Sequence, residues 1–484
     1  MNHRRLLPGL ILPGVLAVLL AGCGVEQDKT MKVSASPDNI KNSENAMNRQ
    51  IIWAMPLEYY EWTDLGENAA YLNELLAEDG YAYQLSFMPL EQEAYDDIIS
   101  SGRTEGTDII SLGPGAGDGT IGNPQLLLEA GVLYDMTDYL HSPVGSGLYD
   151  AFYEKLWDTL TIGGKICVIP NQYGQDGIGY AAFRREIFGD TVQWDGTVEG
   201  LLSLADQAAI PEGMIPILWG ESLSDISVGM GYEYYNGFFV SLEDGSCYFP
   251  YQTKGLQETY GLMNEWYLSG RLQQRPNSKK IVEEKNYAIW IDWQWDKTRE
   301  AVADEYVFVQ FPFTFSTRVN GGIGICEASS NKEAALELLT LLYTQERYAN
   351  ALMWGEPGVT YELTNNFAEY LNQDDHGSLT LASLMIGIFD LVYPRESDSF
   401  PVNRRDTKWS LYDTEAERES RTAGVLPDFS AIQEKLEALA ALSQEYECIW
   451  QEEDMAAAWD EVNRRYEELG GDAIAAEMES LLNK

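Results

Sequence analysis

Short apolar segments alternate with amphipathic ones from residue 50 to residue 112, and this alternation limits the fold more than any other feature. Residues 50–55 form an apolar run that stops at Pro56, as a buried strand does. Residues 65–80 carry apolar side chains at helical spacing and end in glycine, and residues 81–87 then alternate between apolar and polar. A second helical pattern and a third apolar run complete the series. This order of strands and helices predicts an open, mostly parallel sheet of the α/β class.

The first 23 residues predict export. Residues 1–22 combine a basic start, an apolar stretch too short to span a bilayer and small residues at the end, which is the pattern of a secretory signal peptide. Cys23 directly follows Leu-Ala-Gly, and the whole segment resembles the signal of bacterial lipoproteins. The resemblance implies that the chain is cut before Cys23 and that its sulfur is acylated, for example with palmitate. An ordinary signal peptide whose small residues happen to precede a cysteine is the alternative.

Lipidation would hold the mature protein to the extracytoplasmic face of the cell membrane, because two acyl chains give stable anchoring. Residues 23–48 are polar and have no apolar periodicity, so they are predicted to form a flexible tether. No other run of about 18 apolar residues is present, and the rest of the chain is predicted not to enter the bilayer. The lipid is then the protein's single membrane contact.

The length and the charge of the chain restrict its organisation and its partners. A chain of 484 residues is too long for one ordinary hydrophobic core, which predicts at least two lobes. The 32 Lys and Arg residues face 77 Asp and Glu residues, so the formal net charge is −45. Such a charge repels nucleic acid and anionic lipid surfaces, and no nucleic-acid partner is expected. A highly solvated extracellular surface explains the charge most simply, and an anionic substrate is disfavoured.

Cysteine and histidine are too sparse for a metal or cofactor site to be predicted. Apart from Cys23, the cysteines are scattered without a Cys-x-x-Cys pair, and they could form disulfides in three ways between which the sequence does not decide. Histidine occurs only at positions 3, 141 and 376, which nearly excludes a histidine-based zinc site in the mature chain. These four cysteines are Cys167, Cys247, Cys326 and Cys448.

No catalytic residue is predicted. The glycine-rich segment 113–119 matches neither phosphate-binding pattern, and it is interpreted as a plain turn. A Gly-x-Ser-x-Gly elbow and a His-Glu-x-x-His motif are also missing from the sequence. The enzyme alternative is a secreted glycoside hydrolase with two carboxylates beside the scissile bond, but 77 acidic residues make a chance pair uninformative. The protein is therefore predicted not to be an enzyme.

Several later segments together resemble one family. They are residues 164–170, Tyr180 with residues 183–188, residues 288–295, residues 321–335, and Trp354-Gly355 with residues 358–361. In this order and spacing, and with a lipoprotein signal, they resemble the extracellular solute-binding proteins of bacterial ABC importers, in the carbohydrate-binding group. The resemblance covers nearly the whole chain. Asp292-Trp293-Gln294 departs from the family, which more usually has Gly-Pro or Gly-Ser there.

The resemblance implies a two-lobed clam-shell of the periplasmic-binding-protein type, in which each lobe is an open, mostly parallel sheet flanked by helices. Two or three crossing segments would join the lobes, and the closed, ligand-bound form would be recognised by the membrane subunits of the importer. A monomer is expected. The expected boundaries are 49–170 and 296–350 for lobe one, 178–290 and 355–484 for lobe two, and 171–177, 291–295 and 351–361 for the crossings.

The expected ligand is an oligosaccharide, held in a cleft between the lobes. A sugar has hydroxyl edges that bind planar polar groups and apolar C–H faces that stack on aromatic rings. Both kinds of side chain follow predicted strand ends and crossings. A peptide or a polar amine is the alternative ligand, and a sensor or adhesion lipoprotein with the same fold is the third functional class. The predicted ligand-binding residues are Glu58, Tyr59, Tyr60, Asn171, Tyr173, Trp219, Asp292, Trp293, Trp295 and Trp354.

Overall fold

The computed structural model describes the chain from residue 49 to residue 483 with several gaps. The predicted signal peptide, Cys23 and the tether up to residue 48 lie outside the described residues. Among the described residues, no helix is long and apolar enough to cross a membrane. The described residues are 49–101, 104, 106–112, 124–170, 179–220, 223–274, 286–292, 302, 304–314, 322–372, 377, 379, 382, 386–388, 390–395, 415–425, 427 and 429–483.

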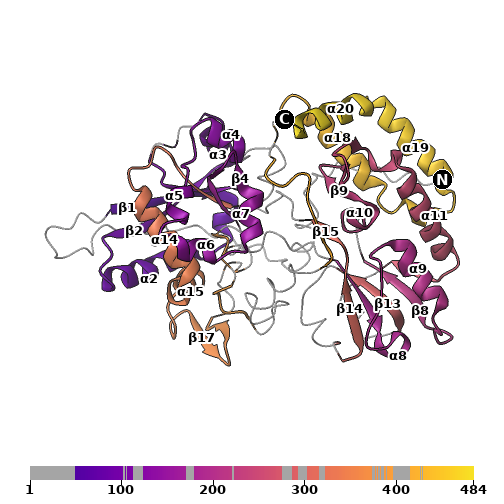
Figure 1. Cartoon of the computed structure of the whole chain (residues 1–484). Coiled ribbons are helices and arrows are strands. Elements are labelled where there is room, and N and C mark those ends of the chain that lie inside the picture. The colour runs from indigo at the N-terminus through magenta and orange to yellow at the C-terminus, as the bar shows by residue number, and fades with distance from the viewer. Residues whose placement is uncertain are drawn as a thin grey trace, which may run out of the picture. The chain divides into compact units, whose positions relative to one another are not determined.

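The first lobe, which contains β1, β2 and α14 in Figure 1, is built around a sheet of five described strands. Their order is β2-β1-β3-β16-β6. Strand β1 pairs in parallel with β2 and with β3, whereas β16 runs antiparallel to β3 and to β6. The sheet is therefore mostly parallel with one reversed strand, which confirms the predicted fold class. The strands are β1 (Arg49–Pro56), β2 (Tyr83–Leu90), β3 (Ile109–Leu112), β6 (Val168–Pro170) and β16 (Gly322–Ile325).

Strand β1 and the helix α2 (Leu65–Glu78) follow the predicted pattern. Trp53, Ala54 and Met55 are fully buried, as expected for a strand of a parallel sheet that is covered on both faces. The apolar stripe of α2 lies in the same core. The helix ends just before Gly80, whose φ of 86° lies in the left-handed region that glycine adopts without steric cost. The spacing of the apolar residues therefore determines both elements.

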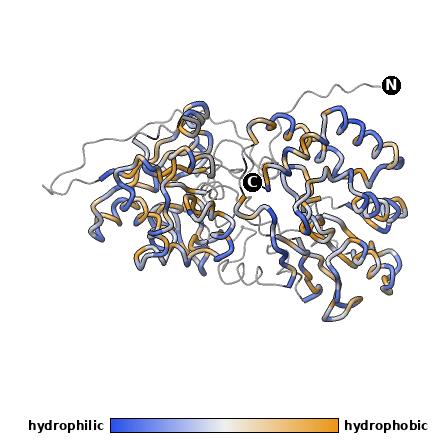
Figure 2. Tube along the Cα trace, turned by 45° about the horizontal axis from the view of Figure 1, so that its top comes forward, coloured by the Kyte–Doolittle hydropathy of each residue, from blue (hydrophilic) through white to orange (hydrophobic). Residues whose placement is uncertain are grey.

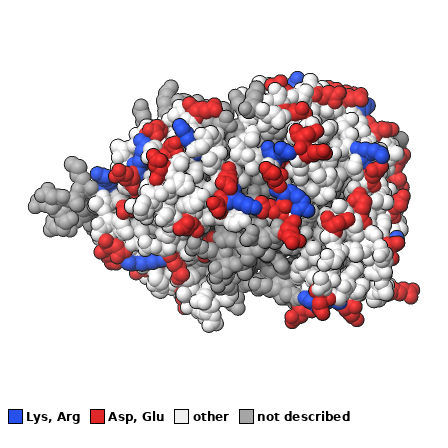
Figure 3. Space-filling model, in the orientation of Figure 1, with Lys and Arg blue, Asp and Glu red and all other residues white. Residues whose placement is uncertain are grey.

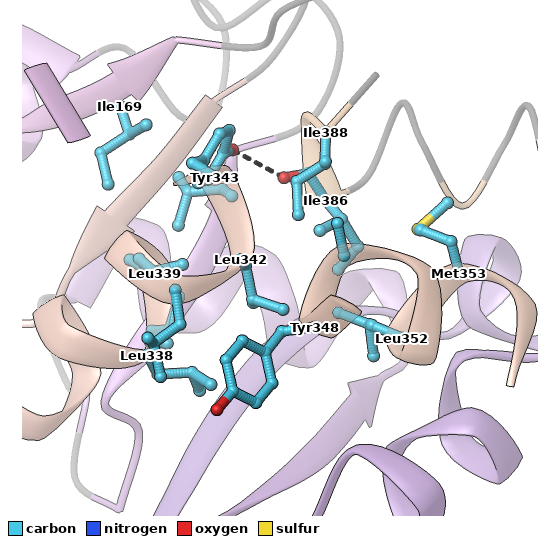
Figure 4. Close-up of a cluster of buried hydrophobic side chains, with 14 of the residues drawn as sticks. Ile169, Leu338, Leu339, Leu342, Tyr343, Tyr348, Leu352, Met353, Ile386 and Ile388 are labelled. Atoms are coloured by element: carbon cyan, nitrogen blue, oxygen red, sulfur yellow. Dashed lines mark hydrogen bonds between the residues drawn. The ribbon is translucent and has the colours of Figure 1, made fainter. Parts of the chain in front are cut away.

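Two later helices complete the core of the first lobe, α14 (Lys332–Thr344) and α15 (Glu346–Trp354). Side chains from these helices and from β6 meet in one buried cluster (Figure 4). The Tyr343 hydroxyl donates a hydrogen bond of 2.7 Å to the backbone oxygen of Ile386, which ties residues 386–388 to this core. The cluster contains Ile169, Leu338, Leu339, Leu342, Leu352 and Met353.

The second lobe has its own sheet of five described strands in the order β12-β8-β13-β7-β14. Strands β12, β8 and β13 are parallel, whereas β7 is antiparallel to β13 and to β14. This sheet is again mostly parallel with one reversed strand. The strands are β7 (Tyr180–Arg184), β8 (Ile215–Trp219), β12 (Leu272–Gln274), β13 (Tyr287–Asp292) and β14 (Tyr306–Gln310).

Helices and a small antiparallel sheet surround the core of the second lobe. The small sheet has the order β11-β10-β9 among the described strands. Hydrophobic and hydrophilic stretches alternate along the helices of each lobe, as amphipathic helices require (Figure 2). The elements are α9 (Val198–Gln207), β9 (Tyr232–Tyr235), β10 (Phe238–Ser241), β11 (Cys247–Tyr248), α11 (Lys254–Leu268), α18 (Gln433–Glu445), α19 (Met455–Glu468) and α20 (Gly471–Leu482).

The second predicted crossing, at 291–295, is wrong. Strand β13 ends at Asp292, and the next described strand, β14, pairs with β7 in the same sheet. The described residues 306–310 therefore belong to the second sheet and not to lobe one as predicted, and the next described strand of the first sheet is β16. The partner of β14 lies more than a hundred residues earlier in the chain, and periodicity cannot reveal such a pairing.

The third predicted crossing, at 351–361, is also wrong. Helix α15 runs through Trp354 with its last residues buried in the first core. The hairpin β17 (Tyr361–Thr364) and β18 (Phe367–Tyr370) packs on the same core through Tyr361 and Tyr370. The described residues between 361 and 388 therefore extend lobe one, although the prediction placed everything from residue 355 in lobe two. After this segment, the next described residue that is fully buried in the second core is Phe429.

A strap formed by residues 415–425 connects the two lobes. Its strand β19 (Glu417–Arg418) pairs in parallel with β15 (Phe313–Thr314), which lies between the last strand of the second sheet and β16 of the first. The strap contacts helix α7 (Glu154–Leu160) of the first lobe, because Gly424 N–H donates to the Thr159 oxygen at 3.1 Å and Lys155 pairs with Glu417. The described strands change from the first sheet to the second between β6 and β7 and back again between β14 and β16, and the strap contacts both lobes.

Candidate functional site

The carboxyl edge of the first sheet carries the candidate site of lobe one. The chain goes from β1 to β2 on one side and then to β3 on the other side, so the direction of the connections reverses between β1 and β3. In open α/β sheets, ligands bind beyond the carboxyl ends of the strands at such a reversal. The short helix α1 (Leu57–Glu61) begins directly after β1 and therefore lies at this edge. The segment that follows β3 lies outside the described residues.

Helix α1 carries three of the predicted ligand-binding residues. Glu58 is exposed, whereas Tyr60 is half-buried with its ring 6.0 Å from the ring of Phe87. Burial raises the pKa of the Tyr60 hydroxyl, and the charge of Glu67 raises it further, so the hydroxyl stays protonated and can donate a hydrogen bond. The backbone of Tyr59 belongs to α1, while its side chain lies outside the described part of the structure. Glu58 and Tyr60 therefore remain candidates to bind a ligand.

The loop after α1 is fastened to a distant segment. The amide and the hydroxyl of Thr63 both donate to the Tyr60 oxygen, at 3.1 and 2.9 Å. The amide of Gly377 lies 3.0 Å from each carboxylate oxygen of Asp64 and donates to them. A Cβ atom at position 377 would lie 2.6 Å from the Cα of Thr63, so this close approach requires glycine. Sequence reasoning did not predict this fastening, because the partners are 313 residues apart.

Trp354 does not lie where the prediction placed it. Its side chain is 0% exposed, and its indole N–H donates a hydrogen bond of 3.0 Å to the Tyr393 oxygen. The rings of Tyr361 and Tyr370 lie 5.5 and 4.7 Å away, and Arg395 lies over the indole. Trp354 is thus a core residue of lobe one and has no exposed face on which a sugar could stack.

The carboxyl edge of the second sheet holds Trp219 and Asp292. The chain runs from β8 to β12 on one side and then to β13 on the other, so β8 and β13 flank the reversal of direction. Trp219 ends β8 and Asp292 ends β13, as the prediction of strand ends requires. Trp219 is only 2% exposed and lies in the second core, contrary to the prediction that it offers an aromatic face.

The remaining predicted residues lie partly or wholly outside the described part of the structure. Asp292 has a described backbone, but its side chain lies outside the described part. Asn171, Tyr173, Trp293 and Trp295 lie wholly outside the described residues. Their assignment to the ligand site therefore stays a prediction. It depends on their position next to β6 and after the carboxyl end of β13, and no longer on a crossing at 291–295.

The described side chains show no metal site. Across the described ranges, no group of three His, Cys, Asp or Glu side chains is placed to hold a metal ion. No disulfide joins any two of Cys167, Cys247, Cys326 and Cys448, so none of the three possible pairings of these cysteines is formed in the structure. Burial raises the pKa of Cys167, Cys247 and Cys326 to about 12, which keeps these thiols protonated.

The surface of the protein is strongly acidic. Asp and Glu side chains outnumber Lys and Arg over both lobes in the visible face (Figure 3). A surface with such an excess of negative charge raises the free energy of bringing an anion to the protein and leaves a neutral molecule unaffected. The site residues after β1 share this character, because residues 57–67 contain four acidic side chains and neither Lys nor Arg.

Comparison with known proteins identifies the fold. No protein-family model matches the chain, and no curated protein matches it. An N-glycan transport solute-binding protein from Streptococcus pneumoniae is similar in structure, with a TM-score of 0.55, 18% identity, and coverage of 90% of this chain and 98% of that one. An HMO-binding, ABC-transporter associated solute-binding protein from Bifidobacterium longum infantis has a TM-score of 0.54 and 14% identity, and covers 90% and 99%. At these identities the likeness shows the fold, so this chain has the two-lobed α/β fold of solute-binding proteins.

Proposed function

We propose that this protein is an extracytoplasmic solute-binding protein that captures an oligosaccharide and delivers it to an ABC importer. The observation that carries the proposal is the shared fold, which extends over 90% of the chain and nearly all of both solved proteins. The first of those proteins is an N-glycan transport solute-binding protein and the second is HMO-binding, which supports a sugar over a peptide. The predicted lipoprotein signal supports an extracytoplasmic place of work and a lipid anchor at Cys23.

The ligand would bind where the carboxyl edges of the two sheets carry polar and aromatic residues. Glu58 and Tyr60 would contribute from the first sheet. Asp292, with Trp293 and Trp295 after it, would contribute from the second. Trp219 and Trp354 are removed from this set because they are buried in the cores. Asn171, Tyr173 and Tyr59 are kept on the argument from sequence.

Ligand capture would be coupled to a hinge motion of the lobes. A ligand that contacts both lobes favours the closed state by the difference between its affinities for the closed and open states. The crossing segments would bend during closure, and the importer's membrane subunits would recognise the closed form. Capture and release then need no covalent chemistry, and the proposed protein is a binding protein.

A thermal-shift screen tests the proposed ligand class. Lacto-N-tetraose, maltotetraose, mannotetraose, a tetrapeptide and spermidine would each be added to the purified mature protein. A compound that binds only the folded state raises the melting temperature. We expect at least one neutral oligosaccharide to do so, and the peptide and the amine to have no effect. Stabilisation by the peptide or the amine alone would contradict the proposal.

Chromatography of the bound sugar separates the binding protein from the glycoside hydrolase. We expect the oligosaccharide to be recovered intact after long incubation with stoichiometric protein. Shorter products that are absent from a boiled control would show that the protein hydrolyses the sugar and is a glycoside hydrolase. Loss of sugar uptake after deletion of the gene, restored by the intact gene, would separate an importer subunit from a sensor or adhesion lipoprotein.

A further inference from the structure

Trp62 is an exposed tryptophan at the carboxyl edge of the first sheet. Its side chain is 62% exposed, whereas Trp53, Trp157 and Trp354 are almost completely buried. Tryptophan is a large apolar residue that is highly buried on average, so an exposed indole leaves apolar surface in water at an energetic cost. Trp62 caps the carboxyl end of α1, which follows β1 directly. The exposed indole therefore lies at the edge where this type of sheet binds ligands.

The backbone that carries Trp62 is held firmly in place. The Trp62 amide donates to the Tyr60 oxygen, and Thr63 makes two further hydrogen bonds to the same oxygen. On the other side, Asp64 accepts from the amide of Gly377 with both carboxylate oxygens. Rigid placement before binding reduces the conformational entropy lost when a ligand is bound. These contacts therefore fix the backbone from which the exposed ring extends, and less conformational entropy is lost there on binding.

Glu58 precedes Trp62 by one helical turn. Residues four apart in a helix lie on the same face, and both Glu58 and Trp62 are exposed. The carboxylate can accept two hydrogen bonds from neighbouring hydroxyl groups, and the indole offers an apolar face next to it. A pyranose ring presents the same two features, an apolar C–H face and an edge of hydroxyl donors. One helical turn thus carries both elements that recognise a single sugar ring.

We infer that Glu58 and Trp62 together bind one neutral pyranose unit of the ligand, with the C–H face on the indole and hydroxyl groups donating to the carboxylate. The inference rests on the proposed function and specifies the ligand as a neutral glycan. The preference for a neutral sugar ring is expected from the negative charge of four carboxylates in residues 57–67, which are Glu58, Glu61, Asp64 and Glu67. A uronic or sialic acid would bring its own negative charge into this field. The preference therefore follows from charge as well as from shape.

Isothermal titration calorimetry on four variants of the mature protein tests the inference. The variants are Trp62→Ala, Trp62→Phe, Glu58→Gln and Tyr248→Ala, and the probes are lacto-N-tetraose, maltotetraose and mannotetraose. Tyr248 is the matched control because it is an aromatic residue 41% exposed on the small sheet of the other lobe. We expect Trp62→Ala to bind the best probe about thirtyfold more weakly, because an aromatic contact in a binding site typically contributes that much. Trp62→Phe should lie between wild type and Trp62→Ala.

Charge is tested with an acidic probe. If charge opposes its binding, sialyl-lacto-N-tetraose should bind at least about tenfold more weakly than lacto-N-tetraose. High salt should reduce this difference in affinity because it screens the carboxylates. The Glu58→Gln variant should bind the neutral probe more weakly and discriminate less against the acidic one. Equal or stronger binding of the acidic sugar would overturn the neutral specificity.

The outcomes separate this inference from the proposed function. If the wild type binds a probe and Trp62→Ala binds it equally well, the inference is overturned while the proposed function stands. Unchanged sugar affinity together with loss of cellular uptake would assign Trp62 to a protein contact and would also overturn it. If the wild type binds no sugar, both fail. All variants should melt at the temperature of the wild type, because the exchanged side chains are exposed.

Discussion

The buried carboxylate of Glu233 accepts hydrogen bonds from both the hydroxyl and the amide of Thr422, a residue 189 positions later in the chain. Ser420 donates its hydroxyl to the same carboxylate at 2.8 and 2.9 Å, and the amide of Arg421 donates at 3.0 Å. Glu233 is only 2% exposed. One acidic side chain of strand β9 therefore holds residues 420–422 of the strap to the second lobe, while Lys155 and Thr159 of α7 hold the strap to the first lobe on either side of them.

Removal of this carboxylate should destabilise the protein. We expect Glu233→Ala to lower the free energy of unfolding by about 3 kcal/mol, because several buried donors lose their acceptor at once. Urea unfolding followed by circular dichroism measures the change. The exposed neighbour Glu243 provides the control, and Glu243→Ala should change the stability by less than about 0.5 kcal/mol. Equal stability of the two variants would mean that the strap is not held through Glu233.

The same carboxylate gives the stability a pH dependence of known sign. Burial raises the pKa of Glu233 above its ordinary value of 4.5, although the hydrogen bonds from Thr422 and Ser420 lower it in part. The folded state therefore retains a proton that the unfolded state has released. The contribution of Glu233 to stability is complete below pH 4.5 and is lost as the pH rises through the higher folded-state pKa. The Glu233→Gln variant should show a flatter profile over this window, and an unchanged slope would contradict the assignment.

Thiol chemistry should distinguish one cysteine from the other three described ones. Cys448 is exposed, whereas the other three thiols are buried with pKa values of about 12. Because the thiolate is the reactive form, we expect Ellman's reagent to modify one thiol rapidly in the folded Cys23→Ala protein and three more only in denaturant. The Cys448→Ser change should abolish the fast phase. Rapid reaction of two or more thiols in the folded state would contradict the described burial.

Trp354 should behave as a core residue. Trp354→Ala should lower the free energy of unfolding by about 3–5 kcal/mol, the usual cost of removing a buried tryptophan. In comparison, Trp62→Ala should leave the stability nearly unchanged. Thermal melts of the two variants side by side provide the measurement. If the Trp354→Ala protein were as stable as the wild type but had lost its affinity for sugar, Trp354 would be a ligand-binding residue and not a core residue.

The anchor should depend on Cys23 alone. We expect Cys23→Ala to abolish acylation and either release soluble protein or leave the unprocessed precursor, because the Cys23 sulfur is the predicted site of the lipid. Metabolic labelling with a fatty-acid probe measures acylation. Normal labelling and cleavage of the Cys23→Ala protein would contradict the lipoprotein interpretation.

Local pattern predicted the elements of the first sheet well. The stripe of α2 and the apolar run of β1 are visible in the sequence because each depends on residues only a few positions apart. The second and third crossings were misplaced because the true path depends on contacts between distant segments, such as the pairing of β14 with β7. The crossing at 291–295 was expected from the family resemblance of residues 288–295, and a local resemblance does not show with which strand the following segment pairs.

The candidate site could be predicted only in outline. Strand ends identify the edge, and Trp219 and Asp292 do end neighbouring strands of the second sheet. Whether a tryptophan near such an edge is exposed depends on neighbours contributed by remote segments. Tyr393 and Tyr370 bury Trp354, whereas Trp62 remains in solvent. The sequence provides no local signal for this difference.

The place of β16 in the first sheet has a consequence for how the chain folds. The residues of β3 and β6 have all been synthesised once the chain reaches residue 170. In the described sheet these two strands are joined through β16, whose residues 322–325 are synthesised much later. Contacts over such separations require closure of long loops and make folding slow. A nascent chain thus cannot complete its first sheet early, and it stays unfolded for longer. Slow closure would suit a protein that must be threaded through a membrane before it folds.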